Sequence, residues 1–398
     1  MSDFFHQQLQ ELRAQSLFRK LREIGTAQAP EVQIVGERLV NFSSDDYLGL
    51  ANDPLLRDAA TAAIVEFGVG AGAPRLVSGT QSPHVRLEAA LAKWKGTQAA
   101  LCFSSGYAAA VGTLQAVAAK SDVVLLDKLC HPALIDGAKL SGATIRVFPH
   151  NHLGKLESHL EWARREHPES KVVVVTESVF SMDGDRVSLR ELVGLKKRYS
   201  ALLFLDESHA VGVIGPNGRG LGADEGLTRH IDVQMGTLSK ALGVSGGYIC
   251  GSRSLIDWLI NRARSFIFST APSPALAAAA QAALEFLASD AGEGRRALLW
   301  RRIQTLRGAM HGGTGKEADA MQTGSAIHPV MVGDEAEAVD FSRSLQAEGF
   351  LAPAIRYPTV AKGAARLRIT VTAAHDEQQI RRLAEALNRL RPELAGAA

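Results

Sequence analysis

Short apolar runs alternate with longer amphipathic segments through the middle of this 398-residue chain. The runs have the length of strands and are apolar almost throughout, as in strands that are covered on both faces. The segments between most of them repeat apolar residues at helical spacing. Strand candidates are 99–103, 122–126, 144–148, 171–176, 201–205 and 233–236, and helix candidates are 107–119, 131–139, 155–166 and 189–198. This alternation predicts a mostly parallel sheet with helices on both faces.

Weaker patterns at the two ends of the chain predict smaller elements. Residues 2–24 repeat apolar side chains at helical spacing and predict an amphipathic helix. Residues 32–42 are typical of a hairpin that turns at Gly36-Glu37. Beyond Ser273 the pattern predicts an α+β unit with a small sheet. Its elements in order are a helix over 274–288, a basic segment over 295–307, a strand over 327–332, a helix over 335–348 and a strand over 365–370.

These elements predict an α/β fold with a large, mostly parallel sheet domain and a smaller α+β C-terminal domain. We assign 1–44 to an N-terminal helix and hairpin segment, 45–280 to the large domain and 281–398 to the small one. Residues 246–251 follow the last parallel strand so closely that we expect them to form an antiparallel neighbour. The glycine-rich stretch 312–315 is typical of a loop tip.

Composition and charge narrow the class of protein. Hydrophobic residues make up 46% of the chain and charged residues 22%, as in ordinary globular enzymes, and the formal net charge of +2 argues against a nucleic-acid-binding surface. The N-terminus lacks a basic region followed by an apolar core, and the alanine-rich helix is too short to span a bilayer. We therefore expect a cytoplasmic enzyme without a membrane or nucleic-acid partner.

Neither the cysteines nor the acidic residues form a metal-binding pattern. Cys102, Cys130 and Cys250 have no metal-ligand or disulfide spacing, and we interpret them as small core residues in a reducing compartment. Asp183-Gly184-Asp185 resembles part of a calcium loop, but the ligands that such a loop carries further along are missing. We expect a turn there and no bound metal.

Lys240 carries the strongest chemical signal in the chain. It lies in the segment 236–243, GTLSKALG, which is otherwise typical of buried backbone. A buried ammonium group is unfavourable unless it is paired or neutralised. A Schiff base with an aldehyde cofactor neutralises it, and pyridoxal phosphate (PLP) is the usual cofactor of this kind. The alternative is a surface lysine that follows a strand.

Asp206 and His209 add to this signal. Asp206 directly follows the apolar run 201–205, so its side chain is expected in the crevice at the carboxyl end of a parallel strand, where open α/β sheets bind ligands. A carboxylate there keeps the pyridine nitrogen of PLP protonated. His209, three residues on, can reach the same ring. The alternatives are a helix N-cap for Asp206 and a structural loop histidine for His209.

Three further positions fit a bound cofactor. Ser104-Ser105-Gly106-Tyr107 follows a strand and opens a helix, where free N–H groups and a glycine favour phosphate, although a plain turn is the alternative. His131 follows another strand and has the ring to stack on a cofactor, or it simply begins a helix. Ser181 has a hydroxyl that can donate to a phenolate oxygen.

These motifs resemble those of the α-oxoamine synthases, PLP enzymes with the aspartate-aminotransferase fold (fold type I). The resemblance extends from Leu12 to His375, nearly the whole chain. The segments that carry it are 41–50, 177–185, 206–212, 236–246 and 354–375. It implies a decarboxylative Claisen condensation between an amino acid and an acyl thioester, within a homodimer whose active sites are shared.

The resemblance also implies a role for each cofactor-binding residue. Lys240 would form the Schiff base, Asp206 would pair with the pyridine nitrogen, and His131 would stack on the ring. The ring oxygen of the cofactor would be bound by His209 and Ser181. Its phosphate would be bound by Gly106, Tyr107 and Thr237. Thr270, which follows Ser269, would reach the phosphate bound in the neighbouring subunit.

For the substrates, the resemblance implies that Arg356 or Arg368 holds the carboxylate of the amino acid, and that Arg19 and Thr359 contact the acyl group. Residues 354–360 are most similar to the branch that joins L-alanine to a pimeloyl thioester in biotin synthesis. Sister branches use glycine or serine, and a non-catalytic subunit would lack Lys240. The thioester can be carried by coenzyme A or by an acyl carrier protein.

Two residues depart from the family pattern near the expected amino-acid site. Asp45 stands where asparagine is usual, and Pro74 replaces a small hydroxyl residue. A charged Asp45 would repel the substrate's carboxylate unless Asp45 is protonated or paired. The choice of amino acid therefore depends on what surrounds Asp45.

Overall fold

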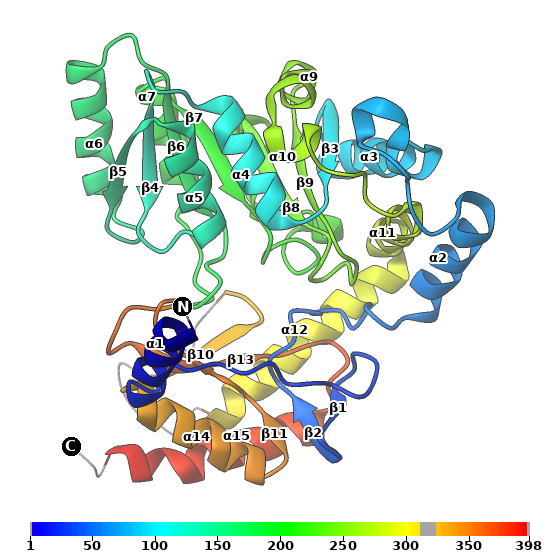
Figure 1. Ribbon diagram of the computed structural model, residues 1–398, viewed down its shortest axis with the longest axis vertical. Helices are drawn as coiled ribbons and strands as arrows, with labels where there is room; N and C mark the ends of the chain where they lie inside the picture. Colours follow the sequence, from blue (N-terminus) through cyan, green and yellow to red (C-terminus); the bar gives the residue numbers. More distant parts are fainter. Residues whose placement is uncertain (1, 311–323, 396–398) are drawn as a thin grey trace. The chain divides into compact units, whose positions relative to one another are not determined.

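The computed structural model describes residues 2–310 and 324–395 (Figure 1). The predicted loop tip at 312–315 lies outside these residues. The chain forms two compact units. The larger unit contains 50–181 and 185–296, and the smaller unit contains the chain up to Gly49, Met182–Gly184 and the chain from Ala297 onward.

This division differs from the domain ranges expected from the sequence, 1–44, 45–280 and 281–398. The N-terminal segment shares a unit with the C-terminal part of the chain, because strand β2 (Glu37–Asn41) pairs in parallel with β11 (Phe350–Leu351). The boundary after residue 296 falls inside one helix, α12 (Asp290–Met310).

A seven-stranded sheet with the order β3-β9-β8-β7-β6-β4-β5 forms the centre of the larger unit. Its strands are β3 (Ala99–Phe103), β4 (Val123–Asp127), β5 (Thr144–Phe148), β6 (Val172–Glu177), β7 (Leu202–Asp206), β8 (Val233–Thr237) and β9 (Gly247–Gly251). Neighbours from β8 to β5 are parallel, whereas β9 is antiparallel to both β3 and β8. The predicted parallel sheet and its antiparallel neighbour are confirmed.

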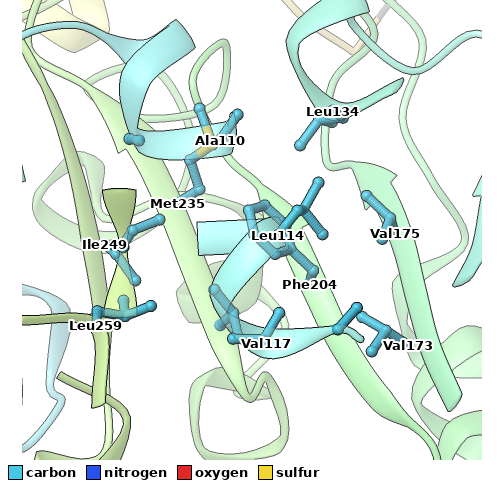
Figure 2. Close-up of a cluster of buried hydrophobic side chains, with 14 of the residues drawn as sticks. Ala110, Leu114, Val117, Leu134, Val173, Val175, Phe204, Met235, Ile249 and Leu259 are labelled. Atoms are coloured by element: carbon cyan, nitrogen blue, oxygen red, sulfur yellow. The ribbon is translucent and has the colours of Figure 1, made fainter. Parts of the chain in front are cut away.

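Helices cover this sheet because its strands are apolar on both sides. The helices of the unit are α2 (Pro54–Phe67), α3 (Ser82–Lys95), α4 (Gly106–Val117), α5 (Pro132–Ser141), α6 (Leu153–Glu166), α7 (Leu189–Arg198), α8 (Leu221–Asp224), α9 (Arg253–Arg262), α10 (Arg264–Ile267) and α11 (Pro274–Leu287). Figure 2 shows Leu114 of α4 and Leu134 of α5 in one cluster with Val173, Val175 and Phe204 of the sheet. Helices α6 and α7 instead contact β4, β5 and β7 from outside this cluster.

Two three-stranded sheets organise the smaller unit. One combines β1 (Glu31–Ile34) with β2 and β11, and the other combines β10 (Ile327–Gly333), β13 (Ala365–Thr370) and β12 (Ala354–Ile355). The helices of this unit are α1 (Ser2–Ala14), α14 (Glu335–Ala347) and α15 (Glu377–Ala395), besides the end of α12. The expected small sheet is present, and the N-terminal hairpin extends the β-structure of this unit.

The structure corrects two predictions near the N-terminus. The helix predicted over 2–24 ends at Ala14, because Ser16 adopts a positive φ of 56° and the chain folds back, with the N–H groups of Leu17 and Phe18 both donating to the Leu12 carbonyl. The hairpin turns at Val35-Gly36 rather than at Gly36-Glu37. Both turn residues have positive φ, as the tight turns that match strand twist require.

A buried ion pair holds the loop that follows β7. Lys95 and Glu207 are 2% and 0% exposed in their side chains and are in direct contact. The Lys95 ammonium group also donates to the carbonyl of Arg219 at 2.5 Å, and Oε1 of Glu207 accepts the N–H of Gly222 at 2.8 Å. Each charge thus has a partner, and the loop from 207 to 222 is fixed at both of its ends.

Candidate active site

One pocket of the larger unit collects residues from the carboxyl ends of β4, β6, β7 and β8. Parallel strands end at the same edge of a sheet, and open α/β sheets bind ligands at that edge. The lining residues are Gly106, Tyr107, His131, Ala133, Glu177, Asp206, Ser208, His209, Met235, Thr237, Ser239 and Lys240. Lys240, Asp206 and His209, which the sequence analysis grouped together, all line this pocket.

Lys240 lies in a turn that follows β8 directly. The Leu238 N–H donates to the Gly246 carbonyl and the Val244 N–H donates back to the Leu238 carbonyl, which closes the turn between β8 and β9. The half-buried Lys240 side chain enters the pocket, and its Nζ donates to Oγ1 of Thr237 at 3.3 Å. The amine therefore points at the pocket, and among residues 2–310 and 324–395 its hydrogen-bond partner is a hydroxyl and not a carboxylate.

Asp206 is the last residue of β7 and is buried. Its Oδ1 accepts hydrogen bonds from the N–H of Ser208 at 2.8 Å and from the Ser208 hydroxyl at 2.5 Å. The Asp206 carbonyl accepts the N–H of Ser178, which binds the loop after β6 to β7. Asp206 is therefore a buried side chain that Ser208 holds in a fixed orientation on the pocket wall.

Glu177 is a pocket residue to which the sequence analysis gave no role. It ends β6 beside Asp206, and its Oε1 accepts the N–H of His131 at 2.5 Å. Burial raises the pKa of Glu177 well above its ordinary value, and the nearby Asp206 raises it further. The signal was present in the sequence, since a carboxyl group follows five residues of an apolar strand.

The phosphate site expected at Ser104–Tyr107 has the form of a narrow cradle. The Ser105 side chain caps α4 by accepting the Ala108 N–H at 3.1 Å. A Cβ added to Gly106 would lie 2.5 Å from Cγ2 of Thr237, so only glycine fits between the helix and β8. The start of α4, which carries the positive end of the helix dipole, is thereby brought against Thr237.

His131 caps the next helix, α5, at the pocket mouth. Its Nδ1 accepts the N–H of Ala133 at 3.2 Å, which leaves Nε2 to carry the proton of the neutral ring. Desolvation lowers the pKa of His131, although Asp206 acts in the opposite sense. A neutral, oriented imidazole is suited to stacking on a flat cofactor.

Other predicted site residues lie outside this pocket. Ser181 is buried in the turn after β6 and Thr270 is exposed, and neither lines the pocket. Thr270 instead forms an isolated antiparallel bridge with Pro74. The roles of both residues stay predictions.

Two arginine sites belong to the smaller unit. Nη2 of Arg19 donates to the carbonyl of Tyr357 at 3.0 Å and to Oγ1 of Thr359 at 3.3 Å, and it also reaches the carbonyl of Arg356. The pKa of Arg356 is lowered by burial, by Arg19 and by Arg22. Three positive charges are therefore concentrated in one place, as in a site for an anion.

Arg368 forms the second arginine site, together with Asp45. Nη1 of Arg368 donates to Oδ1 of Asp45 at 2.8 Å and to Oγ1 of Thr370 at 3.2 Å. Burial alone would lower the pKa of Arg368, but Asp45 raises it above its ordinary value. Asp45 would not repel a carboxylate if it were protonated or paired, and in the structure it is paired with Arg368.

A charged network braces the loops beside the pocket. Nδ1 of His150 lies 3.0 Å from Oδ1 of Asp127, and its Nε2 lies 2.8 Å from Oδ2 of Asp185. The Asn151 side chain also donates to Asp185 at 2.9 Å. Burial alone would lower the pKa of His150, but hydrogen bonds to the two carboxylates outweigh it and raise the pKa to about 10. His150 is therefore a cation that joins the end of β4 to the turn after β6.

Two findings concern metals and membranes. The part of the chain that the structure describes, 2–310 and 324–395, contains no group of three or more histidine, cysteine or acidic side chains placed to hold a metal ion. Within the same residues, no helix combines the length and the apolar character needed to cross a bilayer.

Comparisons with known proteins place this geometry in a family. The family model described as aminotransferase class I and II matches residues 37–387. An 8-amino-7-oxononanoate synthase from Geobacter sulfurreducens is 44% identical over 97% of each chain, and one from Thermoanaerobacter pseudethanolicus is 40% identical over 98% of each.

Solved structures give the same result. A serine palmitoyltransferase from S. paucimobilis with a bound PLP–myriocin aldimine has a TM-score of 0.90 at 29% identity, covering 99% of this chain and 98% of its own. An 8-amino-7-oxononanoate synthase from Francisella tularensis has a TM-score of 0.74 at 25% identity, covering 89% and 98%. The chain belongs to the class I and II aminotransferase family, and the predicted fold type I and α-oxoamine synthase resemblance are confirmed.

The His150 network generates a prediction about pH. The pKa of His150 is raised from 6.5 to about 10 in the folded protein, so its ion pairs stabilise the fold fully below about pH 6.5 and this contribution is lost as the pH rises through 10. We expect urea denaturation to show a stability gap between the parent and His150→Gln that is widest near pH 6 and closes towards pH 10. The exposed His6→Gln serves as control and should show no closing gap. A difference in stability between the parent and His150→Gln that stays the same from pH 6 to pH 10 would contradict the charged state assigned to His150.

Proposed function

We propose that the chain is a PLP-dependent α-oxoamine synthase that condenses L-alanine with a pimeloyl thioester. The products are 8-amino-7-oxononanoate, CO₂ and the free thiol. The observation that carries the proposal is an amine, Lys240, that enters one pocket together with Asp206 and His209. The relatives named 8-amino-7-oxononanoate synthase, matched along nearly their whole length, support the choice of substrates.

The residues of the pocket fit PLP. An amine that donates to the Thr237 hydroxyl, an oriented carboxylate and a glycine cradle at a helix start match the aldehyde, the pyridine nitrogen and the phosphate of this cofactor. When bound, PLP supplies an aldehyde that bonds to an amine and a protonated ring that withdraws electrons from the substrate's Cα. Gly106, Tyr107 and Thr237 would hold the phosphate. His209 and Ser181 would bind the ring oxygen.

The side chains of the pocket would divide the remaining work among them. Lys240 would bond to the cofactor and, once released by the amino acid, its Nζ would take the proton from Cα as a general base. Asp206, held in place by Ser208, would keep the pyridine nitrogen protonated. His131 would cover the ring with a neutral imidazole and exclude water from one side.

The proposal predicts a substrate order and a requirement for Lys240. L-Alanine with pimeloyl-CoA should give the highest kcat/KM among alanine, glycine and serine, and we expect a modest preference of roughly 10- to 200-fold over glycine, because one methyl group is worth only about 1–3 kcal/mol in an apolar pocket. Lys240→Ala should abolish thiol release and the visible absorbance of the bound cofactor.

Lys128→Ala is the matched control, since Lys128 is an exposed lysine that follows β4 and lies outside the pocket. It should retain both the absorbance and the turnover. A higher kcat/KM with glycine or serine would replace the proposed substrate by that of a sister synthase. Turnover by Lys240→Ala would contradict the PLP chemistry altogether.

The Arg19 cluster supports an acyl chain that ends in a carboxylate. Pimeloyl thioesters carry one at the end remote from the thioester, and Arg19, Arg22 and Arg356 concentrate positive charge in one place. Thr359, already in contact with Arg19, would contribute its hydroxyl. Because Arg356 belongs to this cluster, Arg368 is favoured as the residue that binds the carboxylate of the amino acid. Because Arg368 is paired with Asp45, the net positive charge that the carboxylate of the amino acid meets there is lower than that of an unpaired arginine.

Replacement of Arg19 should therefore separate two thioesters of equal length. We expect Arg19→Leu to lower kcat/KM for pimeloyl-CoA by roughly 10- to 100-fold, since hydrogen bonds to charged groups contribute about 1.5–3 kcal/mol. Heptanoyl-CoA, which lacks the carboxylate, should be used about equally by the parent and the variant. Arg38→Leu, which removes an exposed arginine from β2, is the control. An equal loss for both thioesters would place Arg19 outside the acyl site.

We also propose that two copies of the chain form a homodimer. Several large apolar side chains of the larger unit are exposed: Leu55, Ile64, Val65, Val69, Leu76, Val77 and Phe268. They lie on α2 or just after it, on the turn at Arg75–Gly79 and next to α10, and larger patches of exposed apolar groups mark protein interfaces. Thr270 follows Phe268 and would reach the partner's phosphate from there. The three buried cysteines without a disulfide support a cytoplasmic location.

Charge placed on this surface should prevent dimer formation. Val77 is 76% exposed, so Val77→Glu should not disturb the fold, yet it would bury a charge in the interface. Sedimentation velocity should show a dimer for the parent and a monomer for this variant, together with weaker PLP binding. Val147→Glu, on the edge strand β5, is the control and should remain dimeric. A monomeric parent would contradict the proposed homodimer.

A further inference from the structure

Glu177 is a second buried carboxyl group in the pocket of Lys240. It ends β6 as Asp206 ends the neighbouring parallel strand β7, and the two residues are register partners. Register partners on adjacent strands project from the same face of a sheet, with backbones about 4.8 Å apart. Glu177 is 2% exposed and Asp206 is 5% exposed, and both line the pocket. Two buried acidic groups therefore lie side by side in one site.

Glu177 also determines where His131 lies. Its Oε1 accepts the backbone N–H of His131 at 2.5 Å, just before α5 begins. The ring of the same residue is fixed separately, because its Nδ1 accepts the Ala133 N–H. Backbone and ring are thus held by different partners, and the backbone partner is Glu177. A change in the charge or length of Glu177 would be transmitted to the imidazole at the pocket mouth.

The surroundings of Glu177 favour its neutral form. The charged and titratable groups around it are Asp206, Asp127, Lys240, Cys130 and His131. Burial raises the pKa of Glu177 well above its ordinary value and Asp206 raises it further, whereas the His131 N–H and Lys240 act in the opposite sense. Asp206 accepts two hydrogen bonds from Ser208, which hold its side chain in place.

We propose that Glu177 is a positioning residue, a neutral carboxylic acid that anchors His131 and leaves a single negative charge, on Asp206, for the cofactor's ring nitrogen. An ionised Glu177 would place a second negative charge beside Asp206 and compete for the same proton. The final step rests on the proposed PLP chemistry. The neutrality of Glu177 and its anchoring of His131 concern the protein alone.

Two substitutions distinguish a requirement for an uncharged side chain at position 177 from a requirement for an oxygen acceptor there. Glu177→Gln keeps an uncharged oxygen acceptor of the same shape, whereas Glu177→Leu removes it. Titration of the apoprotein with PLP should give a Kd within about threefold of the parent for Glu177→Gln and at least about tenfold weaker for Glu177→Leu, because only the leucine leaves the His131 N–H without an acceptor. A tenfold loss in Glu177→Gln would show that the charged form is required and would overturn the proposal.

Infrared spectroscopy tests the neutral state directly. The carbonyl band of a protonated carboxyl group should be present in the parent apoprotein at neutral pH and missing from Glu177→Gln. Its absence from the parent would overturn the proposal even if both variants bind PLP. Glu207→Gln is the matched control: this buried carboxylate is paired with Lys95, so its loss should leave the band in place while lowering the thermal unfolding midpoint.

This design keeps the two proposals apart. A parent protein that binds no PLP would refute the proposed function, while the infrared band would still decide whether Glu177 is neutral. A parent that binds PLP but lacks the band would refute the role of Glu177 and leave the proposed function intact.

Discussion

The larger unit depends on polar side chains that are held in fixed positions at the ends of buried strands. Strands β6 and β7 are mostly apolar and are buried almost throughout. The polar residues at their ends therefore lack solvent on the side that faces the sheet. Each of these residues is instead given a specific partner: Ser208 for Asp206, the His131 N–H for Glu177 and Lys95 for Glu207. Such contacts are stronger in a region of low dielectric than in water. They therefore fix the loops that line the pocket.

The strands and the central site residues could be predicted from the sequence because both follow from local patterns. A fully buried parallel strand must be apolar at every position, and its carboxyl end must face the crevice. Asp206 and Lys240 were therefore found from the runs that precede them. Glu177 has the same signal, but a terminal glutamate also fits a solvent-exposed loop, and only the register of β6 with β7 shows that it is buried.

What the sequence did not predict depends on contacts between distant positions. The N-terminal helix ends at Ala14 through backbone turns around Ser16, although the apolar spacing continues beyond it. Asp45, judged alone, would repel a carboxylate, but Arg368, 323 positions further on, neutralises it. Hydrophobic periodicity reports which face of an element is buried and carries no information about which partner is found there.

The pairing of β2 with β11 has a consequence for synthesis on the ribosome. Val40 pairs with Phe350, 310 positions later in the chain. The larger unit is complete once Arg296 has been made, and its parallel strands can assemble while the rest is still being translated. The β1–β2 hairpin, in contrast, has an unpaired edge throughout that time. Exposed strand edges invite association with other chains, so the risk of aggregation at this edge lasts from early in translation until β11 has been made.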